Sequence, residues 1–331
     1  METRKVQITG GSTFMVTLPK AWAEKVGLEA GAPVRLIPQA AGTMILQPVI
    51  EDRPSRGILD VRGKFDAILG REIISMYISG FDIIEVRGER ITSEQRQTVR
   101  RVTQWLIGPE IMEESGDSIV IHNLLDLTEL SVPQTVNRIY LIAKSMFEDA
   151  VNALGTKDGE LARDVRDRDD DVDRLCLMIS RQFRSVLRDL LAEQKLGIGA
   201  VEFLAYHTAT GQLERIADHG VKIAHIVDRL ETTVSRNIAA EVEAVTDQVI
   251  QVIDDSMRAL RKRNAELANQ ALELSPAVDE KLLQVNQMLQ DLDPSSSLLM
   301  GIVTDSLGRA KDYGANIAET ALNASSPIPG A

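Results

Sequence analysis

The sequence predicts a multidomain chain in which a small β segment and a small α+β module precede an all-α double three-helix bundle. Strand-like alternation ends near Val132, and from there apolar residues recur at helical spacing to about residue 323. Only 4% of the residues are aromatic although 44% are hydrophobic. A core made mostly of Leu, Ile, Val and Ala suits helix bundles better than β-sandwiches.

Charge is distributed unevenly along the 331 residues. The net charge is −12, but residues 1–50 hold five basic and three acidic side chains, or +2, which leaves −14 for the rest. This balance argues against a protein that coats nucleic acid generally. It still allows DNA binding by a locally basic segment. Cys176 is the only cysteine, so no intrachain disulfide can form. We expect a cytoplasmic protein without membrane insertion, because no apolar run approaches ~20 residues and the start is too polar for a signal peptide.

Residues 1–50 read as two hairpins and one short helix. The expected elements are two strands within residues 4–17 about Gly10-Gly11, a helix Lys20–Val26, and strands Val34–Ile37 and Thr43–Gln47. A segment this short cannot bury much core alone, so we expect obligate association.

One run in this segment carries a family resemblance. Residues 10–22 (Gly-Gly-Ser-Thr-Phe-Met-Val-Thr-Leu-Pro-Lys-Ala-Trp), followed by Val26-Gly-Leu-Glu-Ala-Gly-Ala-Pro-Val34, resemble the AbrB/SpoVT swapped-hairpin domain. The resemblance implies a homodimer in which two chains form one intertwined β-barrel with a face for promoter DNA. The DNA contacts that it implies are Arg4, Lys5, Ser12, Thr13 and Lys20. Alternatively, the barrel only dimerises, or it serves an antitoxin-like or purely protein-interaction role.

A linker is expected at residues 50–56, followed by an α+β module at 57–130. The expected elements are a strand Gly57–Arg62, a helix Phe65–Ile78, a strand Phe81–Arg87, a helix Ser93–Ile107, and a hairpin of Ile111–Glu114 and Ser118–Ile121. The glycines of this module do not form a GxGxxG turn, so nothing indicates nucleotide binding. Its role stays open.

The remaining chain reads as six helices in two triplets, residues 132–232 and 233–323. We expect helices near 134–154, 158–192, 197–232, 236–264, 265–290 and 294–323, with breaks at Gly155, Gly197–Gly199, Ser275-Pro276 and Asp293–Ser297. An internal repeat supports the triplets. Arg215–Ala224 aligns with Arg309–Ala318 at an offset of 94 residues.

Two acidic pairs on the first triplet are the candidate metal ligands. Asp169 falls on an apolar helical stripe and Asp173 lies one turn later, while Glu214 and Asp218 repeat the spacing on the next helix. Carboxylates at i, i+4 repel unless a cation lies between them. Four carboxylates from two packed helices are a ligand set for a hard cation such as Mg, Mn, Ca or Fe. The alternative is a solvated acidic face.

The double bundle with acidic pairs at matching places is similar to the PhoU family of phosphate-uptake regulators. That resemblance implies a metal site at Asp169, Asp173, Glu214 and Asp218, which would hold iron, zinc, manganese or magnesium. It also implies a negative regulator that acts through the phosphate ABC transporter or its signalling partners, and the fused barrel adds a transcriptional arm. In the second triplet the positions of the family's four acidic residues are occupied by Asp279 and Leu283 on one helix and by Gly308 and Asp312 on the other, so only two acids are present. We therefore expect metal in the first bundle alone.

The sequence does not favour an enzyme. Nothing in it resembles a nucleophile with its base, and Cys176 lies on an apolar stripe, as buried structural thiols do. A metal-dependent hydrolase that uses the acidic cluster stays open as an alternative, although no phosphate-binding loop accompanies the cluster.

Overall fold

The computed structural model describes residues 2–38, 42–49, 54–126, 130–188 and 190–326. Residues 2–49 belong to one compact unit and residues 54–326 to another. Of the expected linker at 50–56, residues 50–53 lie outside the described ranges, whereas Arg56 already begins a strand.

The first unit consists of short elements with almost no core. It holds the antiparallel pair β1 (Gln7–Thr9) and β2 (Thr13–Met15), helix α1 (Lys20–Lys25), and the antiparallel pair β3 (Val34–Pro38) and β4 (Met44–Pro48). Ile37, which is 9% exposed, is the one buried hydrophobic residue among its described residues. Large apolar side chains are exposed at Val6, Ile8, Phe14, Met15, Val16, Leu36, Met44, Ile45 and Val49. A surface so apolar is typical of an interface, which agrees with the expected association.

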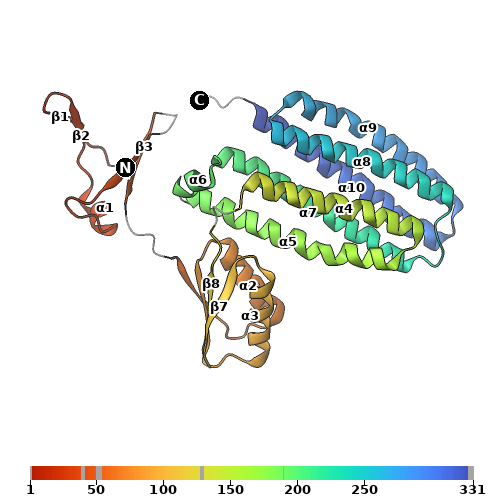
Figure 1. The fold of residues 1–331 in the computed structure, drawn as a ribbon, viewed down its shortest axis with the longest axis horizontal. Coiled ribbons are helices and arrows are strands. Elements are labelled where there is room, and N and C mark those ends of the chain that lie inside the picture. The colour runs from red at the N-terminus through yellow and green to blue at the C-terminus, as the bar shows by residue number, and fades with distance from the viewer. Residues whose placement is uncertain (1, 39–41, 50–53, 127–129, 189, 327–331) are drawn as a thin grey trace. The chain divides into compact units, whose positions relative to one another are not determined.

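The α+β module is a four-stranded sheet with two helices on one face (Figure 1). Along the chain its elements are β5 (Arg56–Asp60), α2 (Asp66–Ile78), β6 (Ile83–Arg87), α3 (Ser93–Trp105), β7 (Pro109–Glu114) and β8 (Ser118–Asn123). The strand order is β5-β6-β8-β7, parallel between β5 and β6 and antiparallel elsewhere. Leu69, Ile73 and Ile119 lie in its core. Thr92 and Gln95 form a capping box that starts α3 where the sequence predicts.

Long helices make up the rest of the second unit. They are α4 (Val132–Thr156), α5 (Gly159–Arg188), α6 (Leu190–Leu196), α7 (Ala200–Arg229), α8 (Arg236–Lys262), α9 (Ala265–Met288) and α10 (Pro294–Ser325), with a 3₁₀ turn at Leu289–Asp291. One continuous apolar core joins them. Among the described residues, no helix combines the length and hydropathy required to cross a bilayer.

The two triplets, α4-α5-α7 and α8-α9-α10, repeat one design. Gly220 on α7 lets that helix approach the backbone of Met146 and Phe147 on α4, and Gly314 on α10 approaches Ile253 on α8 in the same way. Helices α7 and α10 then pack together and join the triplets (Figure 1). The predicted double three-helix bundle is confirmed.

The helix predicted at 158–192 agrees with α5, Gly159–Arg188, and with the helical residues of α6 from Leu190, while residue 189 lies outside the described ranges. One helix boundary differs from the expectation. The break predicted at Ser275-Pro276 is wrong, since α9 runs through Pro276. Ala271 and Val278 are buried on either side of the proline, and their packing holds the helix although proline donates no hydrogen bond.

Arg181 on α5 fixes the α+β module to the bundle. Its side chain is 2% exposed and donates hydrogen bonds to the carbonyl oxygens of Tyr77 at 2.6 Å and Phe81 at 2.9 Å. Its guanidinium also pairs with Asp82 at 3.2 Å and lies 5.1 Å from the centre of the Tyr77 ring. A buried guanidinium is tolerated only with such partners, so the contact requires this docking geometry.

Candidate functional site

The four candidate metal ligands lie along the seam between α5 and α7. Asp169 and Asp173 follow one face of α5, and Glu214 and Asp218 follow one face of α7, which packs against it. Three of the carboxylates are half-buried and Asp218 is exposed. The buried residues between α5 and α7 are apolar, so the four acids lie at the outer edge of the contact between these helices.

The four acids lie close enough together for their charges to raise the pKa of Asp169, Asp173 and Glu214. Burial, and then the charges of Asp169, Glu214 and Asp218, raise the pKa of Asp173 to about 7. Burial and the charge of Asp218 also raise the pKa of Asp169 and of Glu214. Ionisation of Asp169, Asp173 and Glu214 is therefore opposed by neighbouring carboxylates, whereas burial alone raises the pKa of Asp218.

Three arginines of α5 near this cluster pair with other carboxylates. Arg166 pairs with Asp228 at 2.8 Å, and Arg168 pairs with Asp149 at 2.7 Å and with Asp164 at 2.9 Å. Arg174 pairs with Asp171 at 3.6 Å. On α7, Arg215 and Lys222 lower the pKa of Asp218, but burial outweighs them and the net shift is upward.

The donor chemistry fits a hard divalent cation, whereas the side-chain positions require adjustment. Carboxylate oxygens are the ligands that Mg, Mn and Fe(II) prefer. In the part of the chain that the structure describes, no three Asp, Glu, His or Cys side chains converge closely enough to hold an ion as they stand. Metal binding would therefore need rotamer changes across the α5–α7 seam.

The second bundle carries a lysine, Lys311, among the acids that correspond to the cluster of the first bundle. The Lys311 ammonium lies 2.6 Å from the carboxylate of Asp279 on α9 and 2.9 Å from that of Asp312 on α10. Its side chain is 9% exposed, and the two acids raise its pKa against the opposing effect of burial. Sequence reasoning missed this residue. The 94-residue repeat offset, which pairs Lys311 with Ala217, could have found it.

The register predicted for the second acidic pair is wrong by one turn. Buried residues of α5 and α9 match at an offset of 106: Ala162 with Ala268, Val165 with Ala271, Val172 with Val278, Cys176 with Leu282, and Ile179 with Val285. At this offset Asp279 corresponds to Asp173, and Ser275 corresponds to Asp169. Leu283, which was expected at the position of one of the family's acids, is 62% exposed and does not lie on the buried face of α9. The second bundle still keeps only two of the four acids.

His219 and Cys176 lie beside the acidic cluster but are used differently. The His219 ring is 5% exposed, lies 5.8 Å from the Tyr313 ring on α10, and so belongs to the α7–α10 contact. Burial lowers its pKa to about 4, so the ring is neutral at physiological pH. Burial and the neighbouring acids raise the pKa of Cys176, which makes this thiol an inert core group, as expected.

The five predicted DNA contacts are exposed on the first unit. Arg4 and Lys5 precede β1, Ser12 lies in the turn between β1 and β2, Thr13 begins β2, and Lys20 begins α1. Gly10 and Gly11 form that turn with φ of 63° and 79°, a region that glycine enters without strain. Arg4 bonds Glu2, and Lys20 lies 3.6 Å from Glu24. Both pairs are exposed and weak, so phosphates could replace the acids.

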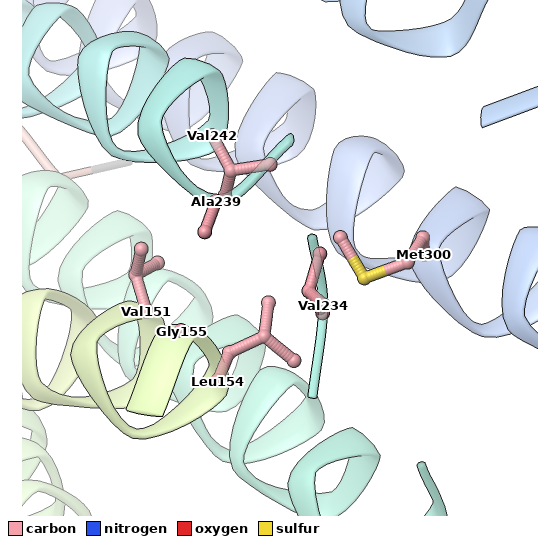
Figure 2. A pocket seen from close by; sticks show the side chains of 7 residues that line it. All are labelled: Val151, Leu154, Gly155, Val234, Ala239, Val242 and Met300. Atoms are coloured by element: carbon pink, nitrogen blue, oxygen red, sulfur yellow. The ribbon is translucent and has the colours of Figure 1, made fainter. Parts of the chain in front are cut away.

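An internal pocket of the helical part offers no ligand site. Its volume is about 10 Å³, and Val151, Leu154, Gly155, Val234, Ala239, Val242 and Met300 line it (Figure 2). A void of this size holds about one water molecule, and an apolar wall gives that water no partner.

Comparison with known proteins agrees with both resemblances. The PhoU domain model matches residues 136–227 and again residues 242–321. A second model, Antidote-toxin recognition MazE, bacterial antitoxin, matches residues 7–53.

The relatives found are PhoU proteins. A phosphate-specific transport system accessory protein PhoU homolog from Pseudomonas aeruginosa is 27% identical over 188 residues, which is 55% of this chain and 76% of the relative. Its homolog in Pseudomonas putida is also 27% identical over 188 residues, 55% of this chain and 72% of the relative. The crystal structure of PhoU from Pseudomonas aeruginosa aligns with a TM-score of 0.52 at 25% identity, covering 58% of this chain and 94% of that one. The phosphate transport system regulatory protein PhoU from Streptococcus pneumoniae has the same fold, with a TM-score of 0.50 at 18% identity over 60% and 94% of the two chains.

Proposed function

The chain belongs to the PhoU family, and from this premise we propose that it is a non-enzymatic accessory regulator of phosphate transport. The observation that carries the proposal is the double match of the PhoU domain to the two helical triplets. Relatives of this chain carry the name of phosphate-specific transport accessory proteins, which supports the same role. The protein would restrain uptake from the cytoplasmic side by binding the phosphate ABC transporter or its signalling partners.

A divalent metal ion in the first bundle is part of the proposal. Asp169, Asp173, Glu214 and Asp218 would hold it, and iron, manganese, magnesium and zinc are the candidates. When bound, the ion would supply the positive charge that this seam of carboxylates lacks. The residues themselves would fix the spacing of α5 and α7, because four carboxylates drawn to one centre join the two helices.

The first unit is proposed to dimerise and to bind DNA. Two chains could cover each other's exposed apolar side chains, since the described residues of one chain bury little there. Arg4, Lys5, Ser12, Thr13 and Lys20 would then face promoter DNA on both copies. Because the rest of the chain carries a net charge of −14, such binding must be local and salt-sensitive. Each phosphate contact should contribute a slope of about −0.9 to log K plotted against log salt concentration.

Phosphate uptake in the natural host tests the regulatory role. Deleting the gene should raise the rate of labelled phosphate uptake in phosphate-replete cells, and the wild-type gene should restore the lower rate. A strain whose uptake is unchanged by deletion would contradict the proposal. Light scattering tests the dimer separately, because the full chain should be dimeric and a chain starting at Pro54 should be monomeric at micromolar concentration.

A second candidate role for the first unit is recognition of a toxin protein. The match of the MazE antitoxin model to residues 7–53 favours it. A toxin that copurifies with the native protein, together with unchanged promoter binding in an Arg4→Ala, Lys20→Ala variant, would support this role over DNA binding.

A further inference from the structure

The α+β module is docked along α5 by polar contacts at two places (Figure 1). At one of them Arg181 donates hydrogen bonds to backbone carbonyl oxygens of the module. At the other, the indole Nε1 of Trp105, the last residue of α3, donates a hydrogen bond to Asp170 Oδ1 at 3.2 Å. Leu177 lies between Asp170 and Arg181 on α5 and packs against the core of the module. Asp170 and Arg181 are about three helical turns apart, or ~16 Å, so the two contacts hold separate ends of the docking surface.

The Trp105 contact lies directly beside the four candidate metal ligands. Asp170 follows Asp169 in sequence and precedes Asp173 by three residues, and side chains three apart on a helix are neighbours. The charge of Asp170 contributes to the raised pKa of both of these acids, which agrees with that spacing. An indole N–H can only donate a hydrogen bond, so Trp105 holds the Asp170 carboxylate in place without neutralising its charge.

We propose that Trp105 is a positioning residue of the metal site and that the α+β module thereby takes part in that site. This inference rests on the metal site proposed for the first bundle. Asp170, held by Trp105, would be a fifth carboxylate beside the four ligands and would act on the ion from outside the ligand set. Hydrogen-bonded groups around metal ligands commonly contribute 10–100-fold to metal affinity, so the loss of this pair should be measurable.

The coupling between the metal and the docked module must act in both directions. If docking of the module strengthens metal binding, bound metal strengthens the docking by the same factor, because linkage between two equilibria is reciprocal. The Arg181 contact holds its end of the module whether or not metal is bound. Residues 57–130, in which the sequence shows no motif of chemistry, would thus respond to the metal through the Trp105 end of α3.

Calorimetric titration of the full chain with Mn²⁺ tests the positioning role. Trp105→Phe keeps an aromatic ring and removes the N–H group, and Asp170→Asn removes the charge, so each should lower the affinity for Mn²⁺ about tenfold. The double variant should lose no more than Asp170→Asn alone, because Trp105 acts through Asp170. Asp167→Asn is the matched control. Asp167 is also exposed on α5, but it lies two residues before Asp169 and therefore on another side of the helix, so the affinity should not change.

The fluorescence of Trp105 gives a second readout of the same coupling. The chain contains two tryptophans, so Trp22→Phe leaves Trp105 as the single indole. Addition of Mg²⁺ or Zn²⁺ should change the Trp105 emission along the saturation curve that calorimetry gives for the same ion. Asp170→Asn should abolish this change. Asp170 is exposed, so this variant should fold as the wild type does, which circular dichroism checks.

The expected result is about tenfold weaker Mn²⁺ binding in both single variants, together with emission that follows metal binding. Metal binding that neither variant alters, with constant Trp105 emission, would overturn the positioning role and leave the proposed metal site intact. Losses that multiply in the double variant would show that Trp105 acts by packing instead of through Asp170, and would overturn the inference as well. A wild-type chain that binds none of these metals would overturn both the inference and the metal site.

Discussion

The two helical bundles share one scaffold and differ in the charge at one seam. Buried residues match between them at fixed offsets, and glycines at matching places allow the same close helix approach. In the first bundle the seam carries Asp169, Asp173, Glu214 and Asp218, whose pKa values are all raised. In the second bundle Lys311 lies between the two remaining acids.

The two bundles differ in the source of positive charge at this seam. Lys311 supplies positive charge permanently, because its pKa lies above the ordinary value of a lysine. Ala217 occupies the corresponding position in the first bundle and supplies none. The second bundle thus carries its own cation at this seam, whereas we propose that the first bundle is stabilised there by protons or by a metal ion from solution.

The largest expected effect is on metal uptake by the first bundle. Asp169→Asn with Asp218→Asn removes a carboxylate from each helix and should lower affinity for Mn²⁺ at least 100-fold in calorimetric titration. Chelation should lower the melting temperature of the wild-type protein but not of this variant. In the chelated state the variant should melt higher, since it has lost two repelling charges.

Asp279→Asn with Asp312→Asn is the matched control in the second bundle. It should leave Mn²⁺ uptake unchanged, because Lys311 already occupies the charge site there. Metal bound in the second bundle, or none in the first after remetallation with manganese, iron, zinc and magnesium, would contradict the comparison.

Ala217→Lys should convert the first bundle to the second type. A lysine at this position would place an ammonium near the clustered acids, as Lys311 does from the matching position of α10. We expect Mn²⁺ affinity to fall at least tenfold and the metal-free protein to melt higher. Ala217→Met has a similar length without the charge and should do neither. Equal loss of metal in both variants would mean that side-chain bulk, rather than charge, blocks the site.

The pH dependence of stability should also separate the two bundles. The pKa of Asp173 is raised from 3.8 to about 7 in the folded state, so the folded protein holds a proton that the unfolded chain releases. The free energy of unfolding should therefore fall as pH rises from about 4 to about 7, by roughly 1–2 kcal/mol after allowance for solvent screening. Asp173→Asn should flatten this slope in denaturant titrations without metal. An equally steep slope in the variant would place the titrating group elsewhere.

The sequence predicts elements whose signals are local. Thr92 and Gln95 mark the start of α3, and the alternation of β5 through β8 marks the sheet, so these elements lie where predicted within a few residues. The repeat that relates α7 to α10 is visible in the sequence because small and apolar residues recur at an offset of 94 residues. The grouping of four acids also follows from helical spacing once α5 and α7 pack together.

Features that depend on long-range packing could not be predicted in this way. Pro276 signals a break, but burial of its neighbours on α9 outweighs that local preference. The register of α9 against α5 required knowing which leucine is buried, and Leu282 and Leu283 are equivalent in sequence terms. The Arg181 contact joins residues about 100 positions apart, which no local pattern encodes.

The smallest expected effect is the loss of the second bundle's fixed cation. Lys311→Met keeps the length and packing of the side chain and removes the charge. Asp279 and Asp312 are 57% and 52% exposed, so water can solvate them when the ammonium is gone. The free energy of unfolding should fall by only about 1 kcal/mol. Because the folded-state pKa of Lys311 is raised, this contribution is fully present below about pH 10.5 and is lost as pH rises through the folded value. The difference between wild type and variant should thus stay constant from pH 6 to pH 9 in urea titrations, while Mn²⁺ uptake by the first bundle is unchanged. A difference that changed within this range would show that Lys311 is not the charged group that holds the second seam.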